Sequence, residues 1–195
     1  MNKFNFLRII KNHFCTLCDQ SGNYLLGDWI FHLFLPIIIS LAICFFDGPM
    51  ATSIAGVLVN FGAITTALLM SAVLMVYDQK QKVKEKIIKL EQEISTPSNS
   101  DGSGSSDVLR DHLSDLEIDH ALYGQLCSNI SYAILSSAIV VIFSVAISFF
   151  TSSVIPFSIK AWVYYGLSAL CYFVFISTII TFLMIIKRFS AVLEG

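Results

Sequence analysis

Residues 56–72 read GVLVNFGAITTALLMSA, and they lie within an apolar segment, Ala51 to Tyr77, that is long enough to cross a bilayer. The stretch has no ionisable side chain, but it contains Asn60, Thr65 and Thr66. On an α-helix, residues spaced by three and four positions share one face. The small and polar residues that share such a face, called the Asn60 face below, are Ser53, Gly56, Asn60, Ala63, Ala67 and Ser71.

The chemistry of the Asn60 face allows two interpretations. Small residues let membrane helices approach closely, and an amide can hydrogen-bond across the contact. A later apolar segment carries a matching series: Ala133, Ser137, Ser144 and Ser148. The two series can therefore pack on each other within the chain, or repeated copies of the Asn60 helix can line a narrow pore. Thr65 and Thr66 point away from this face, and we expect their hydroxyl groups to bond to carbonyl groups of their own helix.

Four apolar segments, each of about 18 residues or more, indicate the fold class. They run from Trp29 to Phe46, from Ala51 to Tyr77, from Ile130 to Phe150 and from Ala161 to Ile186. Charged residues make up 13% of the 195-residue chain, against about 25% in soluble domains. The segments lack the polar face that a helix of a soluble protein would present to water. The sequence therefore predicts an all-α integral membrane protein with four transmembrane helices.

The basic residues predict its orientation. Eleven of the twelve lysine and arginine residues precede the first segment, separate the second from the third, or follow the fourth, and only Lys160 lies on the other side. Positive charge favours the cytoplasmic side of a membrane. We therefore expect a multi-pass protein of the bacterial inner membrane, with both termini and the central loop in the cytoplasm.

The expected organisation has five parts. Residues 1–28 form a cytoplasmic amphipathic segment, 29–77 the first two transmembrane helices, 78–128 a cytoplasmic helical hairpin with a flexible tip at 95–107, 129–187 the last two transmembrane helices, and 188–195 a cytoplasmic tail. The first part interleaves basic residues with Phe and Ile and has no cleavage-site pattern, so it indicates a helix on the inner membrane surface rather than a signal peptide.

Heptad spacing predicts the hairpin between the second and third membrane helices. The apolar positions of the first arm are Val76, Val83, Ile87, Leu90 and Ile94. Those of the second arm are Leu109, Leu113, Leu116, His120, Tyr123 and Cys127. Pro, Gly and Ser in residues 95–107 interrupt the helix, and Ser106 or Asp107 can cap the second arm. The sequence therefore predicts two antiparallel arms that pair through an apolar seam.

The two arms carry opposite charge, which we expect to fix their register. The lysines of the first arm are Lys80, Lys82, Lys84, Lys86 and Lys89. The carboxylates of the second arm include Asp111, Asp115 and Asp119. These residues also form a candidate surface for a cytosolic protein or nucleoprotein. Because heptads run along both arms, we expect the protein to be a homo-oligomer with its hairpins bundled beneath the membrane.

Catalytic and metal-binding patterns are weak. His13, Cys15 and Cys18 form a C-x-x-C with a nearby histidine, but zinc requires a fourth ligand, so apolar anchoring is the favoured interpretation. His112, Asp115 and Asp119 can share one helix face, for which a solvated acidic face is favoured over a cation site. The chain has no Gly-rich phosphate loop and no recognisable nucleophile motif. We therefore expect no enzyme activity, no cofactor, no metal and no small-molecule substrate.

The layout of basic amphipathic start, two membrane helices, hairpin from Lys80 to Tyr123 and two further membrane helices resembles a known class. It is similar to small membrane effectors of bacterial anti-phage systems, such as those paired with retrons or nucleotide-signalling modules. The resemblance implies a non-enzymatic effector that a cytosolic partner holds inactive and that permeabilises the inner membrane on infection. The hairpin would then be the sensor surface, and the Asn60 helix would permeabilise.

Two alternatives share much of this layout. Immunity proteins against pore-forming bacteriocins are also small, four-helix inner-membrane proteins with both termini inside, although they typically need no long cytoplasmic hairpin. A membrane scaffold that recruits a cytosolic complex through its hairpin is the other. Toxicity on expression alone distinguishes the effector from both.

Overall fold

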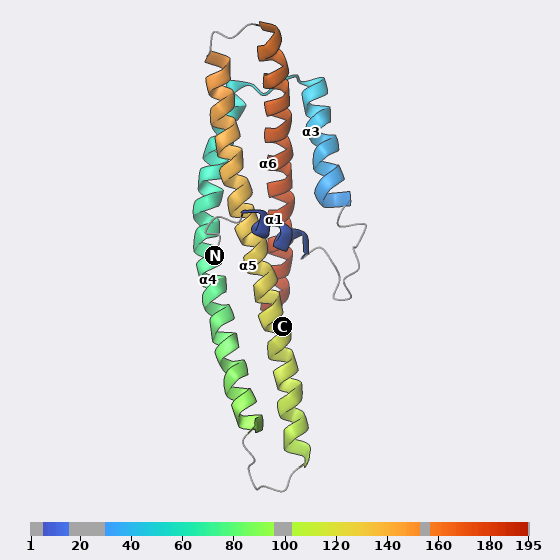
Figure 1. The fold of residues 1–195 in the computed structure, drawn as a ribbon, viewed down its shortest axis with the longest axis vertical. Helices are drawn as coiled ribbons and strands as arrows, with labels where there is room; N and C mark the ends of the chain where they lie inside the picture. The colour runs from blue at the N-terminus through green and yellow to red at the C-terminus, as the bar shows by residue number, and fades with distance from the viewer. Residues whose placement is uncertain (1–5, 16–29, 96–102, 153–156, 195) are drawn as a thin grey trace.

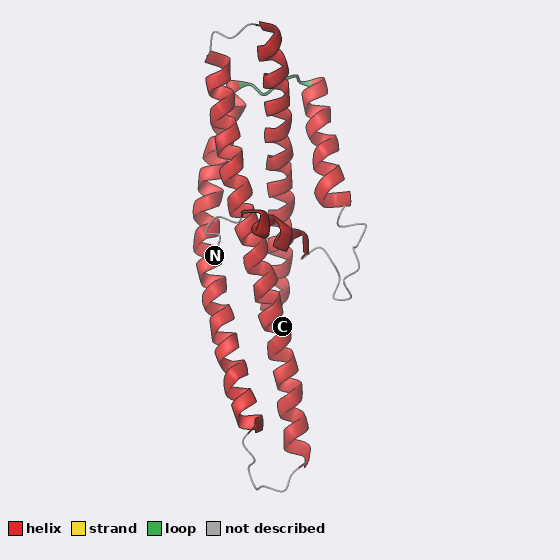
Figure 2. Cartoon of the chain, viewed as in Figure 1, coloured by secondary structure: helices red, strands yellow, loops and turns green. Residues whose placement is uncertain are grey.

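The computed structural model describes residues 6–15, 30–95, 103–152 and 157–194, and every element in these ranges is a helix (Figure 1 and Figure 2). The elements are α1 (Phe6–Cys15), the π-helical turn η1 (Ile30–Phe34), α3 (Leu35–Phe46), α4 (Thr52–Ser95), α5 (Ser103–Ser152) and α6 (Phe157–Glu194). The prediction of an all-α protein is confirmed for the described residues.

Within those ranges, three helices are long and apolar enough to cross a membrane: Thr52–Ser95, Val108–Thr151 and Ala161–Ser190. The first predicted segment instead gives a shorter apolar helix, His32–Phe46. Pro36 lies near its start and has no backbone N–H to donate to the carbonyl of His32. This missing bond fits the change from π-helical to α-helical geometry at Leu35.

The three long helices form the core of the molecule. α5 lies between α4 and α6, α3 packs on the outer side of α6, and α1 crosses α5 (Figure 1). One apolar cluster joins Met50, Ala55, Leu58, Val140, Ile147, Cys171 and Tyr172. A second joins Leu69, Val76, Leu126, Ile130, Ala133 and Ile185. Each cluster therefore combines side chains from α4, α5 and α6.

The turn between α3 and α4 is fixed by α6. Gly48 has a φ of 79°, a left-handed conformation that favours glycine. Met50 is fully buried, its N–H donates to Ser168 Oγ at 3.1 Å, and its carbonyl accepts a hydrogen bond from the Tyr164 hydroxyl. The Ser40 hydroxyl of α3 also donates to the Ala169 carbonyl of α6 at 2.9 Å. These bonds attach the peripheral α3 to the three-helix core.

α4 and α5 remain side by side beyond the apolar clusters (Figure 1). Val76 and Leu116 of the expected seam are buried, and its other members are half-buried, whereas Ile88 and Ile118 on other faces are 44% and 54% exposed. The heptad spacing thus identified the contacting sides of both helices. α5 begins at Ser103 rather than at Ser106 or Asp107. Six residues of the expected tip, Ser95 and 103–107, are therefore helical, because each residue added to an existing helix gains a backbone hydrogen bond.

No ion pair within 4 Å joins α4 and α5 among the described residues, so the expected role of charge in fixing their register stays a prediction. Among the residues described, the ion pair found within 4 Å joins Lys82 and Asp78 of α4 at 2.8 Å. Lys80 lies instead over α5, where a Cβ at Gly124 would be 3.1 Å from the Lys80 Nζ. Exposed lysines keep their hydration and their rotamer freedom, so a defined pair across the two helices gains little.

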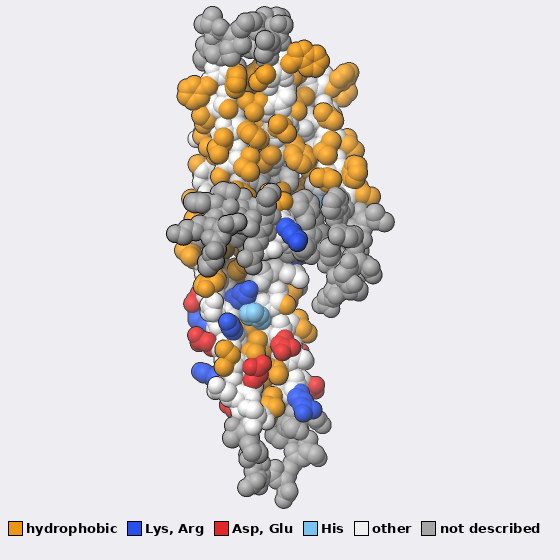
Figure 3. All heavy atoms as spheres, in the orientation of Figure 1, with side chains coloured by type: hydrophobic (Ala, Val, Ile, Leu, Met, Phe, Trp, Pro, Cys, Tyr) orange, Lys and Arg blue, Asp and Glu red, His pale blue; other side chains and the backbone are white. Residues whose placement is uncertain are grey.

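Side-chain types separate along the long axis of the molecule (Figure 3). Hydrophobic side chains cover α3, α6 and the adjoining parts of α4 and α5, whereas charged side chains gather on the remaining parts of α4 and α5. α1 lies across the bundle near the boundary between these zones (Figure 1). This distribution is consistent with a membrane protein.

Candidate functional site

The six residues of the Asn60 face are all exposed. The opposite side of α4 is buried, and it consists of Ala55, Leu58, Gly62, Thr65, Leu69 and Val76. Residues two positions apart on a helix point about 200° apart, so Asn60 points away from the side that contains Leu58 and Gly62. The interpretation that the Asn60 face packs on the serine series of α5 within the chain is therefore wrong.

Of the serine series of α5, Ser137 packs closely against the Gly62 side of α4, whereas Ser144 contacts Cys171 of α6 and Ser148 is exposed. Ala133, Ser137 and Ser144 are buried. A Cβ at Gly62 would lie 2.5 Å from Val141 Cγ2 and 2.9 Å from the Ser137 carbonyl oxygen. Gly62 is thus the small residue that lets α4 and α5 approach closely. A side chain at this position would overlap Val141 and Ser137 of α5.

Thr66 supplies the polar link at this close approach. Its hydroxyl donates to the Gly62 carbonyl at 2.7 Å, which confirms the expected bond within its own helix. The same Oγ1 lies 2.8 Å from Ser137 Oγ of α5. Thr66 therefore joins the two helices as well as its own turn.

Asn60 presents an amide on an otherwise apolar outer surface of α4. Its side chain has no hydrogen bond to any residue that the structure describes. Nearby outward-pointing residues are large and hydrophobic: Val57 is 66% exposed, Ile64 61% and Leu68 64%. An amide in such surroundings gains free energy by pairing with a second polar group, because hydrocarbon offers none.

The candidate partner surface on the charged parts of α4 and α5 is open. Lys82, Lys84, Lys86 and Lys89 are exposed, as are Asp111, Asp115 and Asp119, whereas Lys80 is half-buried. The pKa of His120, which lies in the seam, is lowered by burial and by the charges of Lys80 and Lys84. The positive potential of the lysines therefore reaches across to α5.

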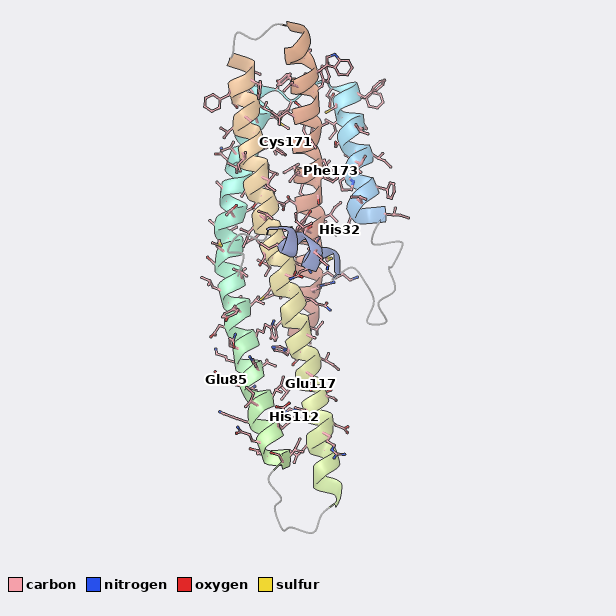
Figure 4. All side chains as sticks on the ribbon, in the orientation of Figure 1. His32, Glu85, His112, Glu117, Cys171 and Phe173 are labelled. Carbon is pink, nitrogen blue, oxygen red and sulfur yellow. The ribbon has the colours of Figure 1, made fainter. Side chains whose placement is uncertain are left out.

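No three His, Cys, Asp or Glu side chains in the described ranges gather as ligands of a metal ion. His112 is exposed on α5 (Figure 4). Cys18 and the side chain of Cys15 lie outside the described residues, so the C-x-x-C motif is not placed.

A buried polar cluster, the His13 cluster, is the feature that sequence reasoning missed. Its members, from four helices, are His13 of α1, His32 of η1, Asn129 and Tyr132 of α5, and Thr181 of α6. The His13 Nδ1 lies 2.9 Å from Asn129 Oδ1, and the His13 ring stacks on Tyr132 with centroids 3.9 Å apart and planes 3° apart. His32 Nε2 lies 3.4 Å from Thr181 Oγ1 (Figure 4).

Hydroxyl groups continue the polar contacts between α5 and α6. The Tyr132 hydroxyl lies 3.3 Å from Ser177 Oγ, and the Thr178 hydroxyl donates to Ser136 Oγ at 3.0 Å. Further along, Ser144 Oγ lies 3.4 Å from Cys171 Sγ. Such pairs hold helices together in lipid. The available signal in the sequence was the run of Ser and Thr in α6, at positions 168, 177, 178 and 181.

The pKa of His13 is lowered within this cluster. Burial lowers its pKa from 6.5 to about 4, with further lowering by His32 and Arg188, although the bond to Asn129 acts in the opposite direction. The ring is therefore neutral at physiological pH, which lets it stack and bond inside the protein. The cluster thus joins α1 and η1 to α5 and α6.

No family model, curated protein or solved structure matches the chain. Functional inference therefore starts from two features of the molecule, the outward Asn60 face and the buried His13 cluster.

Proposed function

We propose that the protein crosses the inner membrane four times, with η1 and α3 as the first span and the apolar parts of α4, α5 and α6 as the others. Both termini and the charged hairpin of α4 and α5 then lie in the cytoplasm. The separation of side-chain types along the molecule supports this placement (Figure 3), as does the position of eleven of the twelve basic residues. η1 and α3 together run about 25 Å, which local thinning of the bilayer accommodates.

In this placement the Asn60 face meets lipid unless another molecule covers it. A second copy supplies the complementary groups, because small residues on both helices permit close contact and the two amides can pair. The observation that carries the proposal is the exposure of all six residues of the face around an amide without a bond to the described residues. The protein is accordingly a homo-oligomer associated through α4.

Copies that gather with their Asn60 faces inward surround a narrow passage lined by amides, hydroxyls and small side chains. The passage has no fixed charge, since the face contains no ionisable residue, so it is weakly selective. Opening it dissipates the membrane potential. We therefore propose a non-enzymatic membrane effector of anti-phage defence that kills the infected cell, and the layout of the chain supports this choice.

The charged hairpin is the proposed site of control. Its aspartates and its lysines other than Lys80 are exposed on α4 and α5 themselves, in parts that continue directly from the proposed membrane spans. A cytosolic protein or nucleoprotein bound there can therefore bias the packing of the membrane helices. Removal of this partner on infection releases the effector.

The test is the membrane potential of a bacterial host, read with a voltage-sensitive dye after the protein is induced alone. Asn60→Leu removes the amide, and Ile54→Leu is the matched control, because Ile54 is exposed on α4 and points about 120° away from Asn60. With membrane levels equalised, we expect depolarisation by the wild type and by Ile54→Leu, and at least a tenfold smaller effect with Asn60→Leu.

Other outcomes separate the alternatives. Equal depolarisation by all three proteins removes the Asn60 face from the passage. Harmless expression together with resistance to one pore-forming bacteriocin identifies an immunity protein instead. Harmless expression in both assays, including phage challenge with the neighbouring genes present, favours the scaffold.

A further inference from the structure

His13 is the anchor of α1. Of the α1 side chains that the structure describes, Ile9 to His13, only His13 is buried, at 0% exposure. Its ring is stacked on Tyr132 and bonded to Asn129, both on α5. Lys11 and Asn12 on the same helix are exposed. Among the described side chains of α1, the one buried contact with α5 is therefore made by a titratable ring.

Among the residues that the structure describes, the groups beside His13 accept its neutral ring, while burial, His32 and Arg188 oppose its charged form. α5 contributes the neutral Asn129 and Tyr132, η1 contributes His32 with ring centroids 5.3 Å away, and α6 contributes the cation Arg188. Protonation would place a positive charge in a buried site beside a second histidine and an arginine. Both burial and repulsion oppose such a charge.

We propose that His13 is an acid-sensitive latch: the neutral ring holds α1 across α5, and protonation releases α1 onto the inner surface of the bilayer. The released helix is suited to that surface, because its sequence FLRIIKNHFC alternates apolar residues with Arg8 and Lys11. A basic amphipathic helix binds anionic lipid headgroups with its apolar face inserted.

The direction of the pH dependence follows from the pKa of His13 when α1 is docked and when it is released. Docked His13 has a pKa of about 4, and in the released helix the pKa returns to 6.5. Docking is therefore fully favoured above pH 6.5 and weakens as the pH falls toward 4. From these values, the ratio of released to docked protein rises about fourfold by pH 6 and about thirtyfold by pH 5.

The experiment measures the position of α1 directly, in the full chain in nanodiscs of phosphatidylethanolamine and phosphatidylglycerol. Spin labels on a keto-bearing unnatural amino acid at Asn12 and Ser114, both exposed, leave the native cysteines unmodified. Pulsed electron resonance then gives the fractions of docked and released α1 between pH 7.5 and pH 5. We expect the ratio of released to docked α1 to grow on acidification by the factors above.

Three variants isolate His13. His13→Lys carries a charge at every pH, so α1 should be released already at pH 7.5. His13→Gln is neutral and keeps a donor for Asn129, so its distances should not change with pH. His120→Gln, the matched control in the seam of α4 and α5, should retain the wild-type response. A response that persists in His13→Gln, or a docked His13→Lys, overturns the proposal.

The latch does not rest on the proposed effector function, since the readout is a distance within one protomer. If the effector function holds as well, proton entry through the passage lowers the cytoplasmic pH and releases more α1. A failure of the depolarisation test leaves the pH response of α1 intact, so the two failures are distinguishable.

Discussion

At the scale of single residues, two asparagines lie in opposite environments. Asn129 is fully buried and bonded to His13, whereas Asn60 is exposed on α4. Asn60 is conspicuous in the sequence because it interrupts an apolar run. Asn129 precedes the third apolar segment by one residue, where polar side chains are common. Its role becomes visible only in the structure, where α1 places His13 against it.

Replacement of Asn129 by leucine should destabilise the protein. The His13 Nδ1 loses its 2.9 Å partner inside a buried site, which costs about 1–3 kcal/mol. The measurement is thermal unfolding of the purified protein in mild detergent, where we expect a lower Tm. Gln79→Leu is the matched control, because Gln79 is exposed on α4 outside the Asn60 face, and it should leave the Tm unchanged. Equal Tm values for the two variants would contradict the buried role of Asn129.

A methyl group at Gly62 should be poorly tolerated. The new Cβ would lie within 3 Å of Val141 Cγ2 and of the Ser137 carbonyl oxygen, so α4 and α5 must move apart. Overpacking of this kind costs about 1–3 kcal/mol. Gly166→Ala on α6 is the control, because nothing lies within 4 Å of its Cβ position, and it should be neutral or slightly stabilising. A Gly62→Ala protein as stable as Gly166→Ala would show that the helices separate easily.

At the scale of elements, the apolar seam rather than charge holds α4 and α5 together in the hairpin. Leu116→Ala should therefore destabilise by about 2–4 kcal/mol, because Leu116 is buried between the helices at 8% exposure. Ile118→Ala, at 54% exposure, is the control and should change the Tm little. The same unfolding measurement at low and high salt should give similar Tm values, since no direct ion pair joins the described parts of the two arms. A large drop in Tm with added salt would restore the role of charge.

Periodicity in the sequence predicted the packed sides of helices better in the charged parts of α4 and α5 than in the apolar segments. In the charged parts, heptad spacing identified Val83, Ile87 and Leu113 as half-buried residues, because polar residues occupy the outward positions. In the apolar segments, both packed and exposed residues are apolar, so hydropathy does not distinguish the sides. Both Gly56 and Gly62 make one side of α4 small enough for close helix packing. Only the structure shows which side is used inside the protomer, because Val141 and Ser137 of α5 lie against Gly62.

The N-terminal segment shows a different limit of the sequence. Its amphipathic pattern predicted an interfacial helix, and α1 does lie across the bundle near the change from apolar to charged surface (Figures 1 and 3). The pattern gave no sign that His13 would be buried, because its partners Asn129 and Tyr132 are more than a hundred residues away.

At the scale of the whole molecule, the polar side chains of the apolar helices differ in whether they have a hydrogen-bond partner on another helix. The hydroxyl groups between α5 and α6 have partners across the contact, and Thr66 links α4 to Ser137. The Asn60 face has no such partner among the described residues. The polar side chains named above are hydrogen-bonded between helices of one protomer, whereas the Asn60 amide has no partner among the described residues. The proposed self-association would supply that partner.

Cysteine substitutions along α4 test that conclusion in native membranes. If copies meet at the Asn60 face, Ala63→Cys and Ala67→Cys lie near their counterparts and should form disulfide-linked dimers on mild oxidation. Ile54→Cys and Leu68→Cys are the matched controls, because Ile54 and Leu68 are exposed on α4 but point about 120° and 80° away from Asn60. Gel mobility without reductant gives the dimer fraction, with the native cysteines as background. Adding Asn60→Leu to Ala67→Cys should lower its dimer fraction several-fold, because the amide pair is lost. Equal dimer fractions at all four positions would mean that copies collide at random, and α4 would then have no defined partner face.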